Sequence, residues 1–372
     1  MRVVVAPDKF KGSLTAPEVA AAVRRGLLAF QPDADVVELP MADGGDGTVD
    51  VALAAGWDQV EVEATGPTGE PARATYAVRG SEALVELADV VGLRRLPSTG
   101  PDPLGASTYG LGTVLRRAVD RGARRIIVGV GGSASTDGGA GMLQALGVRL
   151  VDAEGVDLRR GGGQLSDLAT IDLTGLDPRF REVDVVIASD VDNPLLGLTG
   201  AAAVYGPQKG ASAGEVRDLE AGLTRLAQVM AEETGRDCAE MPGSGAAGGA
   251  SFGALAVLGA RLEPGVALLL DLVGFANVVP GAVLVVTGEG SLDEQSLRGK
   301  VPVGVARAAA QHGVPVVAVT ARCSVGQDQL EAVGISAAYS LSDLEIDPGR
   351  SMQQAATLLE RLAMRVGKEW LS

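Results

Sequence analysis

Short apolar strands alternate with amphipathic helices near both ends of this sequence, and this alternation limits the folds that the chain can adopt. Residues 2–6 and 35–39 each predict a strand, and a helix with Thr15 and Glu18 as its capping box lies between them. The alternation returns late in the chain, with strands expected at residues 283–286, 314–319 and 335–339. Strands joined through helices run parallel, so the two ends together predict one doubly wound parallel sheet.

Between these ends the pattern changes. Residues 60–64 and 72–78 predict a β-hairpin, and further strands and helices follow, among them a helix over 213–234. At about 150 residues per domain, 372 residues correspond to two domains. We therefore expect an α/β protein in which residues 1–60 and 283–372 form one discontinuous domain. An inserted α/β domain with a mixed sheet is expected over residues 61–282.

The composition excludes several classes of function. With 32 Lys and Arg against 47 Asp and Glu, the net charge is −15, which disfavours nucleic acid as a partner. The single histidine, His312, removes most imidazole chemistry, and two cysteines form no metal knuckle or disulfide framework. No apolar stretch is long enough for a bilayer and no leader pattern opens the chain, so a cytoplasmic protein is expected.

The 52 glycines gather in segments that follow a strand and precede a helix. Such segments present backbone N–H groups and a helix dipole to an anion. In the first two, Lys11 and Ser13 could hold a phosphate or carboxylate, and Asp43 and Asp46 suit Mg²⁺. The alternatives are a solvated loop for Lys11 and ordinary helix capping for the two aspartates.

The longest glycine-rich loop, residues 129–139, carries Ser133, Ser135 and Asp137. These side chains suit a polyhydroxylated substrate or a phosphate. The loop also contains G-x-G-x-x-A after a strand, which leaves open a dinucleotide site and an NAD(P)-dependent dehydrogenase of a small hydroxy acid. Against that reading, the helix begins only after Gly138, so the glycines do not open it.

Later segments add further candidate groups. Asp190 ends a buried strand, where it could accept a proton or serve as a turn residue. Lys209 supplies a cation, and Ser244 with Gly245 resembles an anion site at a helix start. The last segment holds Glu289, Asp293 and Lys300, but it departs from the Walker A pattern, so any phosphoryl transfer uses another architecture.

These segments, in this order, resemble the bacterial glycerate kinase family of the glycerate 2-kinase type. The matching stretches are residues 6–8, 10–14, 42–48, 129–141, 190–194, 206–212, 243–249 and 287–304. The resemblance implies a flavodoxin-like domain with an inserted domain. It also implies ATP-dependent phosphorylation of D-glycerate, at the 2-hydroxyl rather than the 3-hydroxyl, with Mg²⁺ and with no nucleic acid or membrane partner; a homodimer is compatible with it.

The resemblance also suggests roles for the residues. Asp190 would orient or deprotonate the substrate hydroxyl, with Lys11 and Asp43 as further catalytic groups. Asp46, Glu289 and Asp293 would bind Mg²⁺. Phosphate or substrate would be bound by Ser13, Ser133, Ser135, Asp137, Lys209, Ser244, Gly245 and Lys300. Phosphoryl transfer needs positioning and charge neutralisation rather than a histidine.

Overall fold

The computed structural model describes residues 1–372, apart from the side chain of Arg298. The chain divides into two compact units. Unit 1 holds Met1–Asp43, Asp50–Gly56 and Gly265–Ser372, and unit 2 holds Gly44–Val49 and Trp57–Pro264. The observed division differs from the expected one in three places: residues 265–282 belong to unit 1, and residues 44–49 and 57–60 belong to unit 2.

Unit 1 is built on a five-stranded parallel sheet with the order β13-β12-β11-β1-β2. Its strands are β1 (Arg2–Pro7), β2 (Asp35–Glu38), β11 (Ala282–Leu292), β12 (Val316–Cys323) and β13 (Ala337–Ser340). β2 lies on one side of β1 and β11 on the other, so the strand order reverses between β1 and β11. The predicted doubly wound parallel sheet is confirmed.

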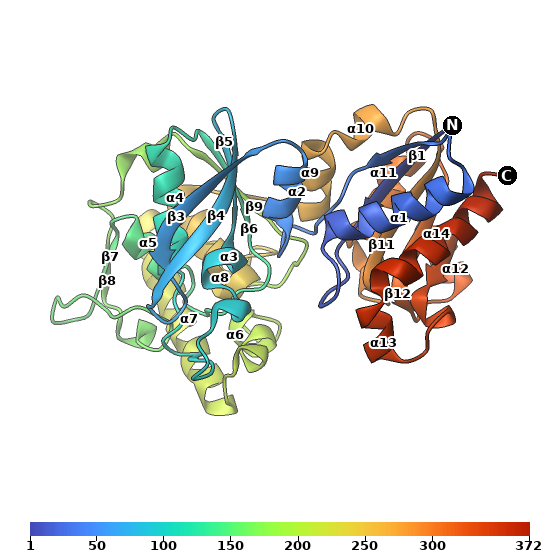
Figure 1. Ribbon diagram of the computed structural model, residues 1–372. Coiled ribbons are helices and arrows are strands. Elements are labelled where there is room, and N and C mark those ends of the chain that lie inside the picture. Colours follow the sequence, from blue (N-terminus) through green and yellow to red (C-terminus); the bar gives the residue numbers. More distant parts are fainter. The chain divides into compact units, whose positions relative to one another are not determined.

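Helices cover this sheet on both faces. On one face, α1 (Ala16–Phe30) and α14 (Ala355–Trp370) lie side by side (Figure 1), and they approach closely at Gly26 because a Cβ atom there would meet Ala363. Their apolar side chains form one core with Val3, Val5 and neighbouring strand residues. Alternate strand residues point the other way, toward α11 (Val301–Ala310), which contacts β1, β11 and β12.

The remaining helices of unit 1 are short. α9 (Gly265–Leu272) packs against α11, because Gly304 leaves room for Val266, and this contact explains why residues 265–282 join unit 1. The last helical segment of the chain is divided into two helices, α13 (Pro348–Gln353) and α14, which meet at Gln354. The others are α2 (Thr48–Ala54), whose first two residues belong to unit 2, α10 (Phe275–Val278), α12 (Gln327–Ala332) and α13 (Pro348–Gln353).

Unit 2 contains a six-stranded mixed sheet with the order β10-β9-β6-β5-β4-β3. The predicted hairpin is present as β3 (Asp58–Thr65) and β4 (Pro71–Arg79), and β4 is antiparallel to β5 (Glu82–Glu86). Parallel pairing continues through β6 (Arg125–Gly129), β9 (Asp184–Ala188) and β10 (Arg261–Glu263). The expected inserted domain with a mixed sheet is therefore confirmed.

The helices of unit 2 are α3 (Leu87–Val91), α4 (Tyr109–Asp120), α5 (Ala140–Ala145), α6 (Ala201–Tyr205), α7 (Ala213–Thr234) and α8 (Ala246–Gly253). A small antiparallel pair, β7 (Arg149–Val151) and β8 (Thr170–Asp172), completes this unit. Helix α7 spans the predicted residues, and both bonds of its capping box between Ser212 and Glu215 are present. The capping box of α1 is also formed as predicted, between Thr15 and Glu18.

Candidate functional site

The carboxyl ends of β1 and β11 are the first candidate site, because the strand order of unit 1 reverses between them. In open α/β sheets, ligands bind beyond the carboxyl ends of the strands at such a reversal. Asp8 follows β1 directly, and its N–H donates to the carbonyl of Gly288 in β11 over 2.8 Å. The next residue, Glu289, lies within β11, which continues to Leu292. The sequence had placed Glu289 in a loop, whereas parallel pairing with β12 extends the strand through it.

Asp8 is a buried carboxylate, only 7% exposed. Its Oδ1 atom accepts a hydrogen bond from the Lys9 N–H over 2.7 Å, and Lys9 Nζ lies 3.5 Å away. Burial raises the pKa of Asp8 to about 6; Lys9 opposes this rise, and the nearby charge of Asp43 adds to it. Asp8 therefore holds its charge at an electrostatic cost. It is a functional candidate that the sequence reasoning missed, although its place directly after the first strand was a usable signal.

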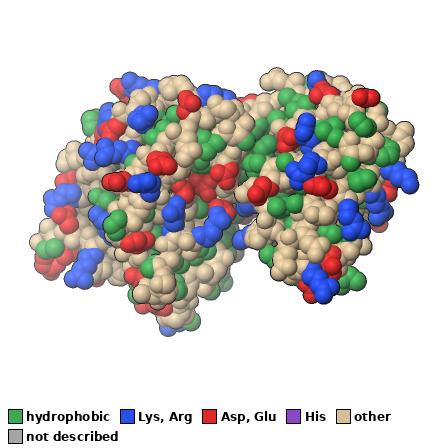
Figure 2. All heavy atoms as spheres, viewed as in Figure 1, with side chains coloured by type: hydrophobic (Ala, Val, Ile, Leu, Met, Phe, Trp, Pro, Cys, Tyr) green, Lys and Arg blue, Asp and Glu red, His purple; other side chains and the backbone are tan. Residues whose placement is uncertain are grey.

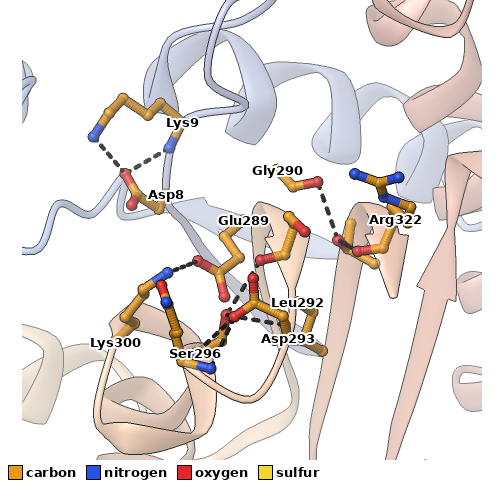
Figure 3. A network of polar contacts seen from close by, with 12 residues as sticks. Asp8, Lys9, Glu289, Gly290, Leu292, Asp293, Ser296, Lys300 and Arg322 are labelled. Atoms are coloured by element: carbon orange, nitrogen blue, oxygen red, sulfur yellow. Dashed lines mark hydrogen bonds and ion pairs between the residues drawn. The ribbon is translucent and has the colours of Figure 1, made fainter. Parts of the chain in front are cut away.

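Glu289 is the second buried carboxylate of this cluster, also 7% exposed. Lys300 Nζ lies 3.9 Å from Oε2, and Oε1 is buried with no hydrogen-bond partner (Figure 3). The pKa of Glu289 is raised to about 7, mainly by burial. The Ser296 hydroxyl and the Lys300 charge oppose this rise, and the charges of Asp8 and Asp293 contribute to it. A buried acceptor without a donor costs about 1–3 kcal/mol, so this atom needs a functional explanation.

The side chain of Asp293 stabilises the turn that follows β11. Its Oδ1 accepts from the N–H groups of Gln295 and Ser296, over 2.9 and 3.1 Å, and from the Ser296 hydroxyl over 3.3 Å. Slight burial acts to raise the pKa of Asp293, but the Ser296 N–H and the Lys300 charge outweigh it, so the net pKa is lowered. Asp293 Oδ1 thus accepts three hydrogen bonds, whereas Glu289 Oε1 accepts none.

The loop after Asp8 is anchored by Phe10, which is buried in the core under α1. Ser13 Oγ donates to the Phe10 carbonyl over 3.1 Å, so this hydroxyl closes its own turn. Lys11 is exposed, and its backbone nitrogen passes close to Gly290, where a Cβ atom would lie 3.3 Å away. Lys9, next to Asp8, is the lysine that the structure brings into the carboxylate cluster.

In unit 2, two of the predicted glycine-rich segments pack against each other. A Cβ atom on Gly129 would lie 2.5 Å from the Gly44 carbonyl, and one on Gly131 would lie 2.6 Å from Gly45 Cα. Glu86, at the end of β5, fixes the first segment by accepting from the N–H groups of Gly47 and Val49, over 3.0 and 3.3 Å. These glycines are needed for contact between two backbones of the same unit.

Asp46 lies on the same segment, and its carboxylate forms an ion pair with Arg94. Sequence reasoning assigned Asp46 to a metal together with Glu289 and Asp293. The structure gives its carboxylate a guanidinium partner inside unit 2, and Arg94 is mostly exposed.

Asp137, in the long glycine-rich loop, is completely buried. It accepts hydrogen bonds over 2.8–3.2 Å from Ser107 Oγ, from the N–H and hydroxyl of Thr108, and from the N–H groups of Gly139 and Gly141. Burial raises the pKa of Asp137, although these hydrogen bonds oppose the rise. The side chain joins the loop to the starts of α4 and α5, so the geometry fits a structural role better than contact with a substrate.

Lys209 is also buried, 3% exposed, in the 3₁₀ turn Pro207–Lys209. Its Nζ donates to the Ser135 carbonyl and lies 3.5 Å from Ser133 Oγ and 3.4 Å from Thr136 Oγ1. Burial lowers the pKa of Lys209 to about 7, and the charge of Asp137 partly counters this. The predicted phosphate ligands Ser133, Ser135 and Lys209 are thus brought together, but their polar atoms bind one another.

The segment around Ser244 and Gly245 leads into α8, yet it is no ordinary helix start. Ala247, Gly248 and Gly249 have left-handed backbone angles, and a Cβ atom on Gly248 would lie 2.8 Å from Lys209 Nζ. The Ser244 hydroxyl is buried and donates to the Ala239 carbonyl over 2.8 Å, while the Gly245 N–H donates to the Asn193 carbonyl. These donors are engaged within unit 2.

Asp190 is exposed, two residues beyond the end of β9. In the sheet, β9 pairs with β6, whose end carries Gly129 and the glycine-rich loop. The predicted acid and the predicted loop therefore leave the same edge of the unit 2 sheet. Among the acids predicted for unit 2, Asp190 is exposed, Asp46 is ion-paired and Asp137 is buried.

Within the described residues, no group of three or more His, Cys, Asp or Glu side chains forms a metal centre made by protein ligands alone. Magnesium does not require one, because it commonly uses one or two carboxylates together with phosphate oxygens and water. The pair Asp8 and Glu289, with one buried oxygen lacking a donor, fits such an ion.

Two global features narrow the class of protein. In the described part of the chain, no helix is both long enough and apolar enough to cross a membrane. On the face shown in Figure 2, Lys and Arg side chains are interspersed with Asp and Glu in both units. This agrees with the acidic composition, and the visible face offers no continuous basic surface for nucleic acid.

Comparison with known proteins identifies the family. Residues 3–371 match the sequence profile of the glycerate kinase family. The chain is 44% identical over 367 residues to the glycerate kinase of Halalkalibacterium halodurans, covering 98% of this chain and 97% of that one. It is 40% identical over 344 residues to the glycerate 2-kinase of Escherichia coli, covering 92% and 90%.

A crystal structure from Salmonella typhimurium LT2, of a protein assigned as glycerate kinase 2, shares the fold. The two superpose with a TM-score of 0.87 at 40% sequence identity, over 99% of this chain and 98% of the other. The dehydrogenase alternative is not supported, because Gly129 and Gly131 pack against the chain's own backbone rather than opening a helix. The chain belongs to the glycerate kinase family.

Proposed function

We propose that the chain is a glycerate kinase that transfers the γ-phosphoryl group of ATP to the 2-hydroxyl of D-glycerate. The observation that carries the proposal is its similarity over nearly the whole length to kinases of glycerate, one of them named glycerate 2-kinase. A pair of buried carboxylates beside two lysines at the strand reversal of unit 1 supports a polyphosphate substrate. We place the protein in the cytoplasm, with D-glycerate and ATP as its partners.

In the proposed reaction a bond forms between the 2-hydroxyl oxygen of glycerate and the γ-phosphorus. The bond from that phosphorus to the bridging oxygen of ATP breaks, and ADP leaves with the electron pair. Asp190 orients the hydroxyl and accepts its proton, for which an exposed carboxylate at the end of a buried strand is suited. Lys11 and Lys300 neutralise anionic groups, since both keep part of their side chains accessible to solvent.

Magnesium is the proposed metal, and it would neutralise charge on the phosphate oxygens. Of the three acids predicted to bind it, Glu289 fits best, because Asp46 is paired with Arg94 and Asp293 caps a turn. Asp43, half-buried and close enough to Asp8 to raise its pKa, adds negative charge to the same edge of unit 1.

The test is ³¹P NMR of the purified protein with Mg-ATP and D-glycerate. A 2-phosphoglycerate resonance appearing together with ADP supports the whole proposal, and its loss in excess EDTA supports the metal. A 3-phosphoglycerate resonance would retain the kinase and overturn the choice of hydroxyl. Unchanged ATP with no phosphate ester would overturn the proposed reaction.

A further inference from the structure

Two acids of unit 1, Asp8 and Glu289, are buried at one edge of the sheet, and nearby positive charges only partly compensate their negative charge. Asp8 and Glu289 are each only 7% exposed. Their lysine partners are distant for ion pairs: Lys9 Nζ lies 3.5 Å from Asp8 Oδ1, and Lys300 Nζ lies 3.9 Å from Glu289 Oε2. Carboxylates in such surroundings need a further positive charge, because desolvation penalises each ion by several kcal/mol.

The position of Glu289 Oε1 points to a ligand. This atom is buried and accepts no hydrogen bond, although nearly all buried polar atoms in proteins have a partner. Lys300 Nζ lies near the other oxygen, Oε2, so it does not provide a hydrogen-bond donor to Oε1. Figure 3 shows Glu289 between Asp8 on one side and the turn of Asp293 and Ser296 on the other.

The neighbouring acid Asp293 lacks this property. Its Oδ1 accepts from the N–H groups of Gln295 and Ser296, as a capping side chain does. Asp293 is thus a carboxylate that stabilises a turn, whereas Glu289 has an oxygen available to bind a ligand. This contrast also singles out Asp8, which was not among the predicted metal ligands, as the carboxylate that accompanies Glu289.

We propose that Asp8 and Glu289 bind one divalent cation at the carboxyl ends of β1 and β11, and that this cation is the Mg²⁺ of a bound nucleoside di- or triphosphate. Two carboxylates leave most of the octahedral shell of Mg²⁺ for phosphate oxygens and water. Lys9 and Lys300 flank the two carboxylates and provide cations for the phosphates. The inference rests on the proposed function for its nucleotide, and it assigns the metal–phosphate end of that nucleotide to unit 1.

The experiment measures metal binding by the full chain without glycerate. Free Mn²⁺, a Mg²⁺ substitute, is quantified by electron paramagnetic resonance during titration, in the absence and presence of ADP. We expect the wild type to bind one Mn²⁺ and ADP to tighten this binding. Asp8→Asn and Glu289→Gln should each weaken Mn²⁺ binding at least about tenfold, since each removes one charged ligand.

Asp293→Asn is the matched control, because asparagine retains an oxygen for the turn and removes only a neighbouring charge. Its Mn²⁺ affinity should therefore fall much less than that of Asp8→Asn or Glu289→Gln. Thermal unfolding without metal checks that Asp8→Asn and Glu289→Gln fold; both should be at least as stable as the wild type. Mn²⁺ binding unaffected by either substitution, or absent from the wild type with and without ADP, would overturn the site. Mn²⁺ binding that ADP leaves unchanged would overturn the nucleotide assignment.

These outcomes are separable from failure of the proposed function. If the protein phosphorylates no glycerate but loses Mn²⁺ affinity in both variants, the metal site holds and the glycerate reaction fails. If phosphorylation proceeds while both variants bind Mn²⁺ normally, the kinase holds and this site fails.

Discussion

Glu289 in unit 1 and Asp137 in unit 2 are both buried carboxylates whose pKa is raised by burial, but their hydrogen bonding is opposite. Asp137 accepts from Ser107, Thr108, Gly139 and Gly141, whereas Glu289 keeps one oxygen without any donor. Burial and a shifted pKa therefore do not identify a ligand-binding acid by themselves. What distinguishes Glu289 is a buried oxygen without a donor at the strand reversal of unit 1. The predictions that follow test this difference, beginning with the strongest expected effect.

The largest effect is expected at Asp190, the exposed acid of unit 2. Asp190→Asn replaces a proton acceptor by an amide and should lower kcat by about 10²–10⁴. Release of ADP, followed in a coupled assay, measures it. Because the side chain is exposed, the urea midpoint should stay at the wild-type value. Near-normal turnover would remove Asp190 from the reaction.

Asp137→Asn should act on stability instead. The amide nitrogen would face N–H and hydroxyl donors, so we expect the free energy of unfolding to fall by about 3 kcal/mol or more. Urea unfolding followed by circular dichroism measures the loss. If this variant unfolded like the wild type and lost only its affinity for glycerate, Asp137 would be a binding residue rather than a structural one.

The buried pair in unit 1 predicts a pH-dependent stability in chelator. The pKa of Asp8 rises from 3.8 to about 6 and that of Glu289 from 4.5 to about 7 on folding. Between about pH 4 and 7 the folded chain thus binds more protons than the unfolded chain, so their contribution to stability falls as pH rises. Asp8→Asn should match the wild type near pH 4 and exceed its unfolding free energy by about 1–3 kcal/mol at pH 7.

Urea titrations at both pH values, in EDTA, test this. If the unfolding free energy of the wild type rose relative to that of Asp8→Asn as pH rises, the pKa of Asp8 would not be raised. Asp8 would then not be a buried charge without sufficient compensation. Added Mg²⁺ should narrow the difference at pH 7, since the cation stabilises the ionised pair.

For Lys209 we expect stability to change with pH in the opposite direction and over a higher pH range. Its folded pKa, about 7, lies below the ordinary 10.5, so between these values the unfolded chain binds more protons and the contribution of Lys209 to stability rises with pH. Lys209→Met should abolish this gain and, by leaving the Ser135 carbonyl without its donor, cost about 1–3 kcal/mol near pH 9. Unfolding free energies at pH 7 and 9 provide the measurement, and equal slopes in the two proteins would count against it.

The smallest effect is expected for Lys11→Ala. The side chain is exposed and would contribute only a screened attraction to an anionic substrate, so KM should rise a few-fold while kcat changes little. Steady-state kinetics at low and high salt test this, since the difference should shrink with salt. Unchanged KM at low salt would make Lys11 a surface lysine with no role in binding.

Much of the fold could be predicted from local patterns. The capping boxes at Thr15 and Ser212, the parallel sheet built from both ends and the β3–β4 hairpin all follow from spacing within a few residues. The domain boundary at residue 282 was less accurate, because the contact of Val266 with Gly304 joins segments that no local pattern relates.

The candidate site was harder to predict for the same reason. Sequence alone suggested that Ser133, Asp137 and Lys209 face a ligand, but whether a polar atom is free depends on donors supplied by remote segments such as Thr108. Asp8 was passed over because a single acid after a strand resembles any turn residue. Its burial beside β11 appears only when strands far apart in sequence pair.

That long-range pairing has a consequence for how the chain acquires its structure. Val3 pairs with Leu284, and α1 packs against α14 near the carboxyl end, whereas residues 57–264 of unit 2 are continuous. During synthesis unit 2 can fold as soon as it emerges, while the apolar strand β1 stays without its neighbour β11 until more than two hundred further residues are made. Assembly of the carboxylate pair is therefore a late event in biogenesis, and the apolar strand β1 stays exposed on that side until β11 has been made.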